Sequence, residues 1–260
     1  MPVETVLANA AFGDDPGRWP LPCAATPREL WLRAVAAGGQ GRYASARADL
    51  AKVYRSAAPE RALAHSTEAS FLRQLGWHTQ ARRWDGRALV LAGPGTEGAA
   101  DALIGLAADA LGVGRFAASE SALVRAGGLL SDSTPPRLRV RLGWVSAELA
   151  MARGEGVTAI AHAERAVEHA ARLGSMRHQV KSSVVLAAAR CSAGDLDTAR
   201  AVADTALDDT DRLGMVPLRW ALACLLADIG SANHPTRDMV MLRDRCADTV
   251  CRRGGVWSVR

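Results

Sequence analysis

Histidines are the first candidates for metal ligands in this chain. His162 and His169 lie seven residues apart, so they would share one face of a helix, with Glu164 and Glu168 nearby. A helical zinc site needs two ligands at i and i+4 and a third ligand from elsewhere. That spacing is absent, and we therefore interpret these histidines as part of a surface helix face.

The cysteines offer no better case for chemistry. Cys246 and Cys251 are five residues apart, whereas the cysteines of a zinc knuckle are separated by two to four residues. Buried, small, apolar thiols are the simpler interpretation. No histidine or carboxylate is spaced to activate a cysteine as a nucleophile.

The acidic residues also lack a catalytic pattern. Asp204, Asp208 and Asp211 form a stripe at helical spacing beside Arg200 and Arg212, which predicts a solvated, ion-paired face. Calcium-binding loops, phosphate-binding glycine loops and the G-x-S-x-G elbow are all missing from the sequence. The sequence thus predicts no catalytic residue, no metal site, no cofactor and no enzymatic activity.

A recurring glycine is the clearest sign of how the chain is organised. Gly41, Gly76, Gly114, Gly154 and Gly194 follow one another at steps of 35, 38, 40 and 40 residues. Each is followed five residues later by a small residue, namely Ala46, Ala81, Ser119, Ala159 and Ala199. A repeat of this length indicates an array of helical hairpins. The abundance of alanine and the scarcity of alternating strand patterns predict an all-α fold.

The first repeat shows how one hairpin is encoded. The run Thr26–Glu29 has the threonine, proline and glutamate spacing of a capping box and predicts the start of a helix. We expect that helix to cover residues 30–37 and to be broken by Gly38 and Gly39. We expect the second helix to run from Tyr43 to about Ala57.

These units resemble the tetratricopeptide repeat (TPR) family. The resemblance rests on the turns Gly41-Arg42-Tyr43 and Gly114-Arg115-Phe116 and on small or apolar residues at the packing positions, which in the first unit are Ala34, Ala46, Leu50 and Val53. It implies a right-handed superhelix of about five antiparallel hairpins, over residues 27–60, 61–94, 99–133, 137–174 and 178–214. Residues 1–26 would then be an extended N-terminal cap, and residues 215–260 would be C-terminal capping helices and a tail. The 40-residue period is similar to that of the sensor arms of bacterial regulators of the LuxR and SARP types.

The resemblance also implies a binding surface on the concave face of the superhelix. Carried over by register, the residues that would face this groove are Arg28, Trp31, Arg73, Arg141, Trp144, Glu148 and Lys181. Arginine and tryptophan are common at interaction hot spots. The alternative is that Trp31 and Trp144 pack between neighbouring hairpins. Because both tryptophans occupy a position of the family's carboxylate clamp, an acidic C-terminal tail is not the expected ligand.

The sequence therefore predicts a regulatory scaffold that binds a peptide or helix of a partner protein, acidic or amphipathic in character. The net charge of +5 leaves a nucleic-acid binder as an alternative, although the arginines are scattered and aromatic residues are only 5% of the chain. A module that senses a small molecule inside the superhelix is a further alternative.

The two ends of the chain give predictions about cellular location and about oligomeric state. The first 15 residues lack the features of a secretory signal, and no long apolar stretch could cross a membrane, so we expect a cytoplasmic protein with reduced thiols. In the closing helix, Met239, Leu242, Cys246 and Val250 share one face. We expect that helix and Trp257 to cap the array within the molecule, and the alternative is a homodimer through the same helix.

Overall fold

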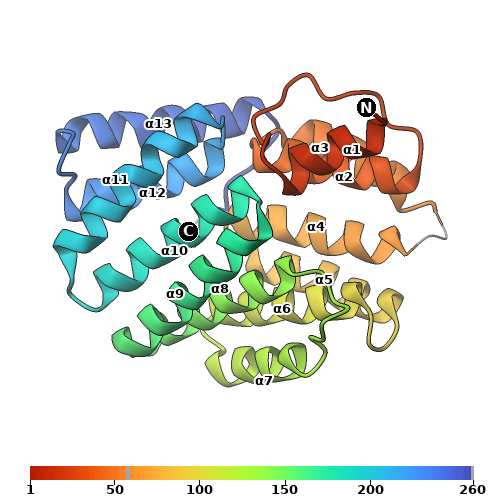
Figure 1. The fold of residues 1–260 in the computed structure, drawn as a ribbon, viewed down its shortest axis with the longest axis horizontal. Coiled ribbons are helices and arrows are strands. Elements are labelled where there is room, and N and C mark those ends of the chain that lie inside the picture. The colour runs from red at the N-terminus through yellow and green to blue at the C-terminus, as the bar shows by residue number, and fades with distance from the viewer. Residues whose placement is uncertain (57–58, 259–260) are drawn as a thin grey trace.

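The computed structural model describes residues 1–56 and 59–258, and all of its regular structure within them is helical (Figure 1). One initial helix is followed by six antiparallel hairpins, each made of two successive helices. The helices are α1 Val3–Phe12, α2 Pro27–Gly39, α3 Tyr43–Val53, α4 Glu60–Gln74, α5 His78–Ala92, α6 Glu97–Gly112, α7 Phe116–Gly127, α8 Arg137–Ala152, α9 Gly156–Leu173, α10 Met176–Ser192, α11 Leu196–Arg212, α12 Val216–Ile229 and α13 Thr236–Arg252. The all-α, TPR-like hairpin fold is thereby confirmed.

The recurring glycine is the turn of each of the first five hairpins, as expected. All five glycines have a positive φ, between 74° at Gly41 and 88° at Gly76, a conformation that is costly for other residues. The residue after each glycine donates its N–H to a carbonyl in the last turn of the preceding helix, for example Arg42 to Ala37 at 2.9 Å. The five small residues that follow are completely buried, so the helices of each hairpin cross closely there.

The helix boundaries of the first hairpin are partly as predicted. The capping box is present, because Thr26 Oγ1 accepts from the Glu29 N–H at 3.2 Å and the Glu29 carboxylate accepts from the Thr26 N–H at 3.1 Å. The predicted break at Gly38 and Gly39 is wrong, since α2 continues to Gly39. Gly38 is needed for packing, because a Cβ atom there would overlap the ring of Phe71 from α4. The second helix, α3, ends at Val53, so the predicted continuation through residues 54–56 is wrong, and Ala57 itself lies outside the described residues.

The N-terminal cap is not entirely extended. Residues 3–12 form α1, which buries Leu7, Ala10 and Ala11 against α2. The rest of the cap does wrap over the first hairpin, where Gln40 Nε2 donates to the carbonyls of Pro16 and Arg18, each at 2.9 Å. A prediction based on proline content missed the helix because the prolines lie after it.

The segment interpreted as capping helices is a sixth hairpin, α12 and α13. The predicted inward face of α13 is buried, with Met239, Leu242 and Cys246 packed against α12 and Val250 packed against the first hairpin. Cys251, in contrast, is exposed, so a buried thiol is confirmed only for Cys246.

The two ends of the array are joined to each other. The Ala44 N–H donates to the Arg253 carbonyl at 2.9 Å, and the Ser258 N–H donates to the Leu75 carbonyl at 2.8 Å. Trp77 Nε1 donates to the Val256 carbonyl at 2.7 Å. Figure 1 shows the end of α13 beside α3, so the hairpins complete a circuit. The tail therefore caps the array within the molecule. No described helix is long and apolar enough to cross a membrane.

Two glycine substitutions test how tightly the hairpins pack. Gly38→Ala should lower the free energy of unfolding by about 1–3 kcal/mol, because the methyl group would force the Phe71 ring to move. Gly86→Ala is the matched control, because Gly86 lies inside helix α5 with no atom within 4 Å of an added Cβ. It should raise the free energy of unfolding by about 1 kcal/mol. Urea denaturation of both variants measures the difference, and equal effects would contradict the packing described.

Candidate functional site

The first helices of successive hairpins pack on one another, from α2 through α4, α6, α8 and α10 to α12, and form the inner layer of the circuit. The side chains that this layer turns toward the centre make up the inner face. The seven residues predicted to line a groove all belong to α2, α4, α8 and α10, which are four helices of this inner layer.

Trp31 lies at the closed end of the inner face, where α1 covers it. Its side chain is only 2% exposed, its Nε1 donates to Thr67 Oγ1 at 3.0 Å, and its ring lies 5.5 Å from that of Phe12. The guanidinium of Arg28 lies over the outer side of the indole at 4.7 Å and is partly exposed. Trp31 thus packs between neighbouring hairpins, and Arg28 lies at its edge.

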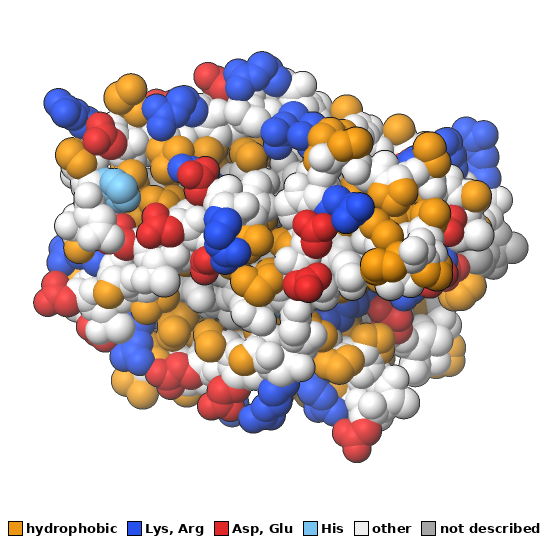
Figure 2. All heavy atoms as spheres, turned by 45° about the horizontal axis from the view of Figure 1, so that its top comes forward, with side chains coloured by type: hydrophobic (Ala, Val, Ile, Leu, Met, Phe, Trp, Pro, Cys, Tyr) orange, Lys and Arg blue, Asp and Glu red, His pale blue; other side chains and the backbone are white. Residues whose placement is uncertain are grey.

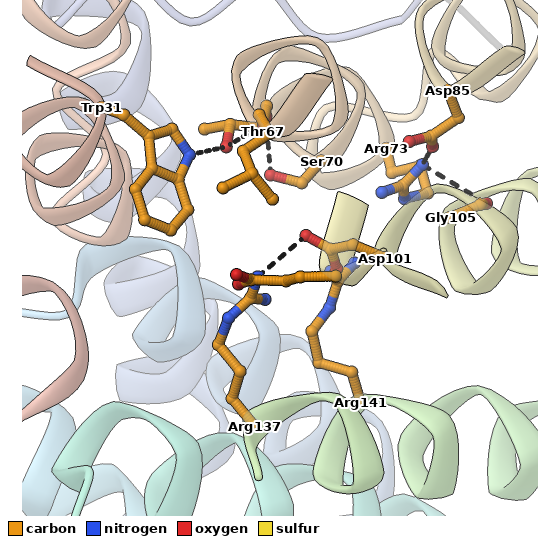
Figure 3. Close-up of polar contacts among 11 residues, drawn as sticks. Trp31, Thr67, Ser70, Arg73, Asp85, Asp101, Gly105, Arg137 and Arg141 are labelled. Carbon is orange, nitrogen blue, oxygen red and sulfur yellow. Dashed lines mark hydrogen bonds and ion pairs between the residues drawn. The ribbon is translucent and has the colours of Figure 1, made fainter. Parts of the chain in front are cut away.

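Arg73 is held in a buried charge cluster that joins two hairpins. Its guanidinium pairs with Asp85 of the same hairpin and, at 2.9 Å, with Asp109 of the next hairpin. A Cβ atom on Gly105 would overlap the Asp85 carboxylate, so the glycine makes room for it (Figure 3). Burial raises the pKa of Asp85 to about 7, while Arg73 opposes that shift. These contacts explain how an acid is held between two hairpins.

Arg137 and Arg141 lie one turn apart on α8 and both reach Asp101 of α6, as Figure 3 shows. Arg137 also pairs with Glu97 at 2.6 Å and lies 5.3 Å from the ring of Phe12. The sequence analysis missed Arg137. Its spacing of four residues from Arg141 was the available signal, because it places both side chains on one helix face.

Trp144 is the centre of the accessible part of the inner face. Its Nε1 donates to Ser182 Oγ at 2.8 Å, and its ring stacks on His178 at a centroid distance of 5.3 Å and an angle of 23°. Lys181 lies 5.9 Å from the same ring and pairs with Glu148 at 3.3 Å. Trp144, Glu148 and Lys181 all remain partly exposed.

Arg177 differs from the other inner cations in lacking an acidic partner. Among the described residues its guanidinium forms no ion pair, and its one hydrogen bond is to the Val35 carbonyl at 3.5 Å. Burial lowers the pKa of Arg177, Tyr43 opposes that shift and Arg137 adds to it. An arginine keeps its proton under these conditions, so an uncompensated positive charge remains on the inner face.

His178 is neutral in this setting. Burial lowers its pKa well below the usual range, and the charges of Arg177, Arg137 and Arg141 act in the same direction. Its Nδ1 lies 2.8 Å from Ser175 Oγ. We define the inner cluster as six residues of α8 and α10: Arg141, Trp144, Glu148, Arg177, His178 and Lys181. The sequence analysis missed Arg177 and His178.

The inner cluster can bind an anion beside an aromatic surface. The hydroxyl that contacts His178, Ser175 Oγ, is fully buried at the start of α10, so it is not accessible to a substrate. Within residues 1–56 and 59–258, no group of three or more histidine, cysteine or acidic side chains could hold a metal ion. The acidic stripe on α11 is only partly the solvated face that we expected. Asp204 is buried and its carboxylate accepts from Ser231 Oγ at 2.6 Å and from the Ala232 N–H at 2.9 Å, which anchors the turn between α12 and α13.

Comparison with known proteins adds little beyond the fold. No family model matches the chain, and no curated protein matches it. A crystal structure of nearly identical TPR-like repeats, from a Podosopora anserina protein named after kinesin light chain, is similar with a TM-score of 0.48. The sequence identity is 17%, over 75% of this chain and 96% of that chain. The TPR-like fold therefore rests on the hairpins of this chain themselves.

The buried histidine predicts how stability depends on pH. Because its folded-state pKa lies below its unfolded value, the unfolded chain takes up a proton as the pH falls below about 6.5 while folded His178 does not, so stability is lost on acidification. His178→Gln should reduce the loss of unfolding free energy between pH 7 and pH 5 by about 2 kcal/mol. Urea denaturation at the two pH values measures this. The exposed His234→Gln is the control, and an unchanged pH dependence in His178→Gln would refute the assignment.

Proposed function

We propose that this chain is a non-catalytic interaction module that holds an acidic or amphipathic segment of another protein on the inner cluster. The observation that carries the proposal is that Arg177 has no acidic partner among the described residues, while the neighbouring residue His178 stacks on the partly exposed ring of Trp144. A carboxylate of the partner would supply the missing counter-charge, and a guanidinium can bind it through two hydrogen bonds. An apolar side chain of the same segment would pack on Trp144.

The remaining predicted residues fit this proposal in different roles. Arg141 and Lys181 already have acidic partners, Asp101 and Glu148, which orient them toward the cluster. The side chains of Lys181 and Glu148 are about one-third exposed. Their ion pair can therefore open, so that each residue pairs with a charged group of the partner instead. Trp31 and Arg73 hold the inner helices together, and Arg28 would contribute at the rim.

The proposed setting is a bacterial regulatory protein in the cytoplasm. The 40-residue period and the resemblance to LuxR- and SARP-type sensor arms suggest the regulatory role. Its five free cysteines suit a reducing compartment. Binding of nucleic acid is less well supported, because the face drawn in Figure 2 intersperses acidic and basic side chains instead of presenting a single basic patch.

A peptide-display selection tests the proposal. A library of random 12-residue peptides selected on the wild-type protein should yield sequences that combine Asp or Glu with apolar residues. An enriched peptide should bind the Arg177→Gln variant at least tenfold more weakly, measured by isothermal titration calorimetry, because the charge that meets its carboxylate is gone. Arg165→Gln is the control, because Arg165 lies on the exposed face of α9 and forms no ion pair with a described residue, so this variant should bind as the wild type does.

Two results would count against this function. Enriched peptides without acidic residues would remove the charge argument. Equal affinity for wild type and Arg177→Gln, with both proteins showing the same thermal unfolding midpoint, would place the binding site elsewhere.

A further inference from the structure

A second feature lies on the outside of the molecule, between α5 and α7. An apolar groove of about 580 Å³ runs over α6 beneath the 93–95 loop. Leu89 of α5, Leu103 of α6 and Leu129 after α7 line it, and Arg125 of α7 lies on its edge. This groove is separate from the inner face, because α5 and α7 are the second helices of their hairpins.

Apolar side chains at the groove are unusually open to water. Val90, which lines the groove, is 84% exposed, and its neighbour Leu91 is 42% exposed. Val124 on α7 is 70% exposed and lies next to Arg125 in the sequence. A single exposed valine is ordinary, but exposed apolar side chains on both of the helices that flank one apolar groove indicate a surface that a partner can cover.

Among the described residues, the unpaired charges on α5 and α7 are all positive. Arg82, Arg83 and Arg87 on α5 and Arg125 on α7 are all exposed, and none of the four forms an ion pair with any described residue. Arg83 and Val90 are seven residues apart, so they share one face of α5. The acids of these two helices are already engaged, because Asp85 is buried with Arg73 and Glu120 pairs with Arg153 at 2.8 Å.

We propose that this groove binds an acidic amphipathic helix of a partner protein. Apolar side chains at i and i+4 of that helix would enter the groove over Leu89, Leu103 and Leu129, and its Asp and Glu residues would face the arginines of α5 and α7. A nucleic acid fits less well, since the groove lining offers no aromatic ring on which a base could stack. The proposal does not depend on the inner cluster.

A display library of 16-residue helical peptides tests it. Each peptide carries leucine at i, i+4, i+7 and i+11, with the other positions varied among Glu, Asp, Ala, Lys and Gln. Selection on the wild-type protein should enrich Glu and Asp. In fluorescence anisotropy, a labelled winner should bind the Val90→Asn, Val124→Asn double variant at least tenfold more weakly. The Arg83→Gln, Arg125→Gln double variant should bind it weakly, with a smaller dependence on salt.

The control combines one change of each kind on α9. Val157 is 84% exposed, as Val90 is, and Arg165 is exposed without an ion pair, so Val157→Asn with Arg165→Gln should leave binding unchanged. Arg177→Gln should also leave it unchanged, which separates this site from the inner cluster. All substituted groove residues are exposed, so the variants should unfold at the wild-type temperature.

Three outcomes would overturn the proposal. The first is a selection in which no enriched peptide loses affinity in the valine variant. The second is binding of a 20-nucleotide oligothymidine that requires the arginines but not the valines, which would assign the surface to nucleic acid. The third is a concentration-dependent dimer, seen by analytical ultracentrifugation, that the valine variant abolishes. That result would make a second copy of the chain the occupant.

Discussion

The structure depends on how the two ends of a helical array are covered. A hairpin buries its apolar faces only against neighbouring hairpins, so the first and last units of an open array each leave one face uncovered. In this protein the ends cover each other. The Arg253 carbonyl accepts from the Ala44 N–H, and Val250 of the last hairpin joins the core of the first. Gly254 is required at this junction, because its φ is +87° and a Cβ atom would lie 2.6 Å from that of Ala44.

Closure also decides what the inner face can do. Once the circuit is complete and α1 covers one side of it, Trp31, Arg137 and His178 are buried, and their charges and polar atoms must be satisfied within the molecule. Arg137 therefore pairs with Glu97 and Asp101, and His178 stays neutral. Trp144 and Glu148 of α8 and Lys181 of α10 keep partial access to solvent. The inner cluster is therefore the part of the inner face on which we place the proposed binding site.

The sequence predicts structural features that depend on a few consecutive residues. It predicts few features that depend on residues far apart in the chain. The five turn glycines and the capping box at Thr26 are recognisable because their function is completed within a few residues. Gly38 was interpreted as a helix break because its reason, the ring of Phe71, lies on another hairpin. Arg177 carries no local signal at all. Its significance comes from the absence of a carboxylate around it, which only the three-dimensional arrangement shows.

Native-state hydrogen exchange tests the closure most directly. In an open array the terminal hairpins would open locally, at a lower free energy than the central ones. The closed circuit predicts that the amides of α3 and α13 are as strongly protected as those of α6 and α8, and that all of them exchange only by unfolding of the whole chain. Faster exchange of α3 and α13 than of the central helices, at free energies well below that of global unfolding, would contradict the closure.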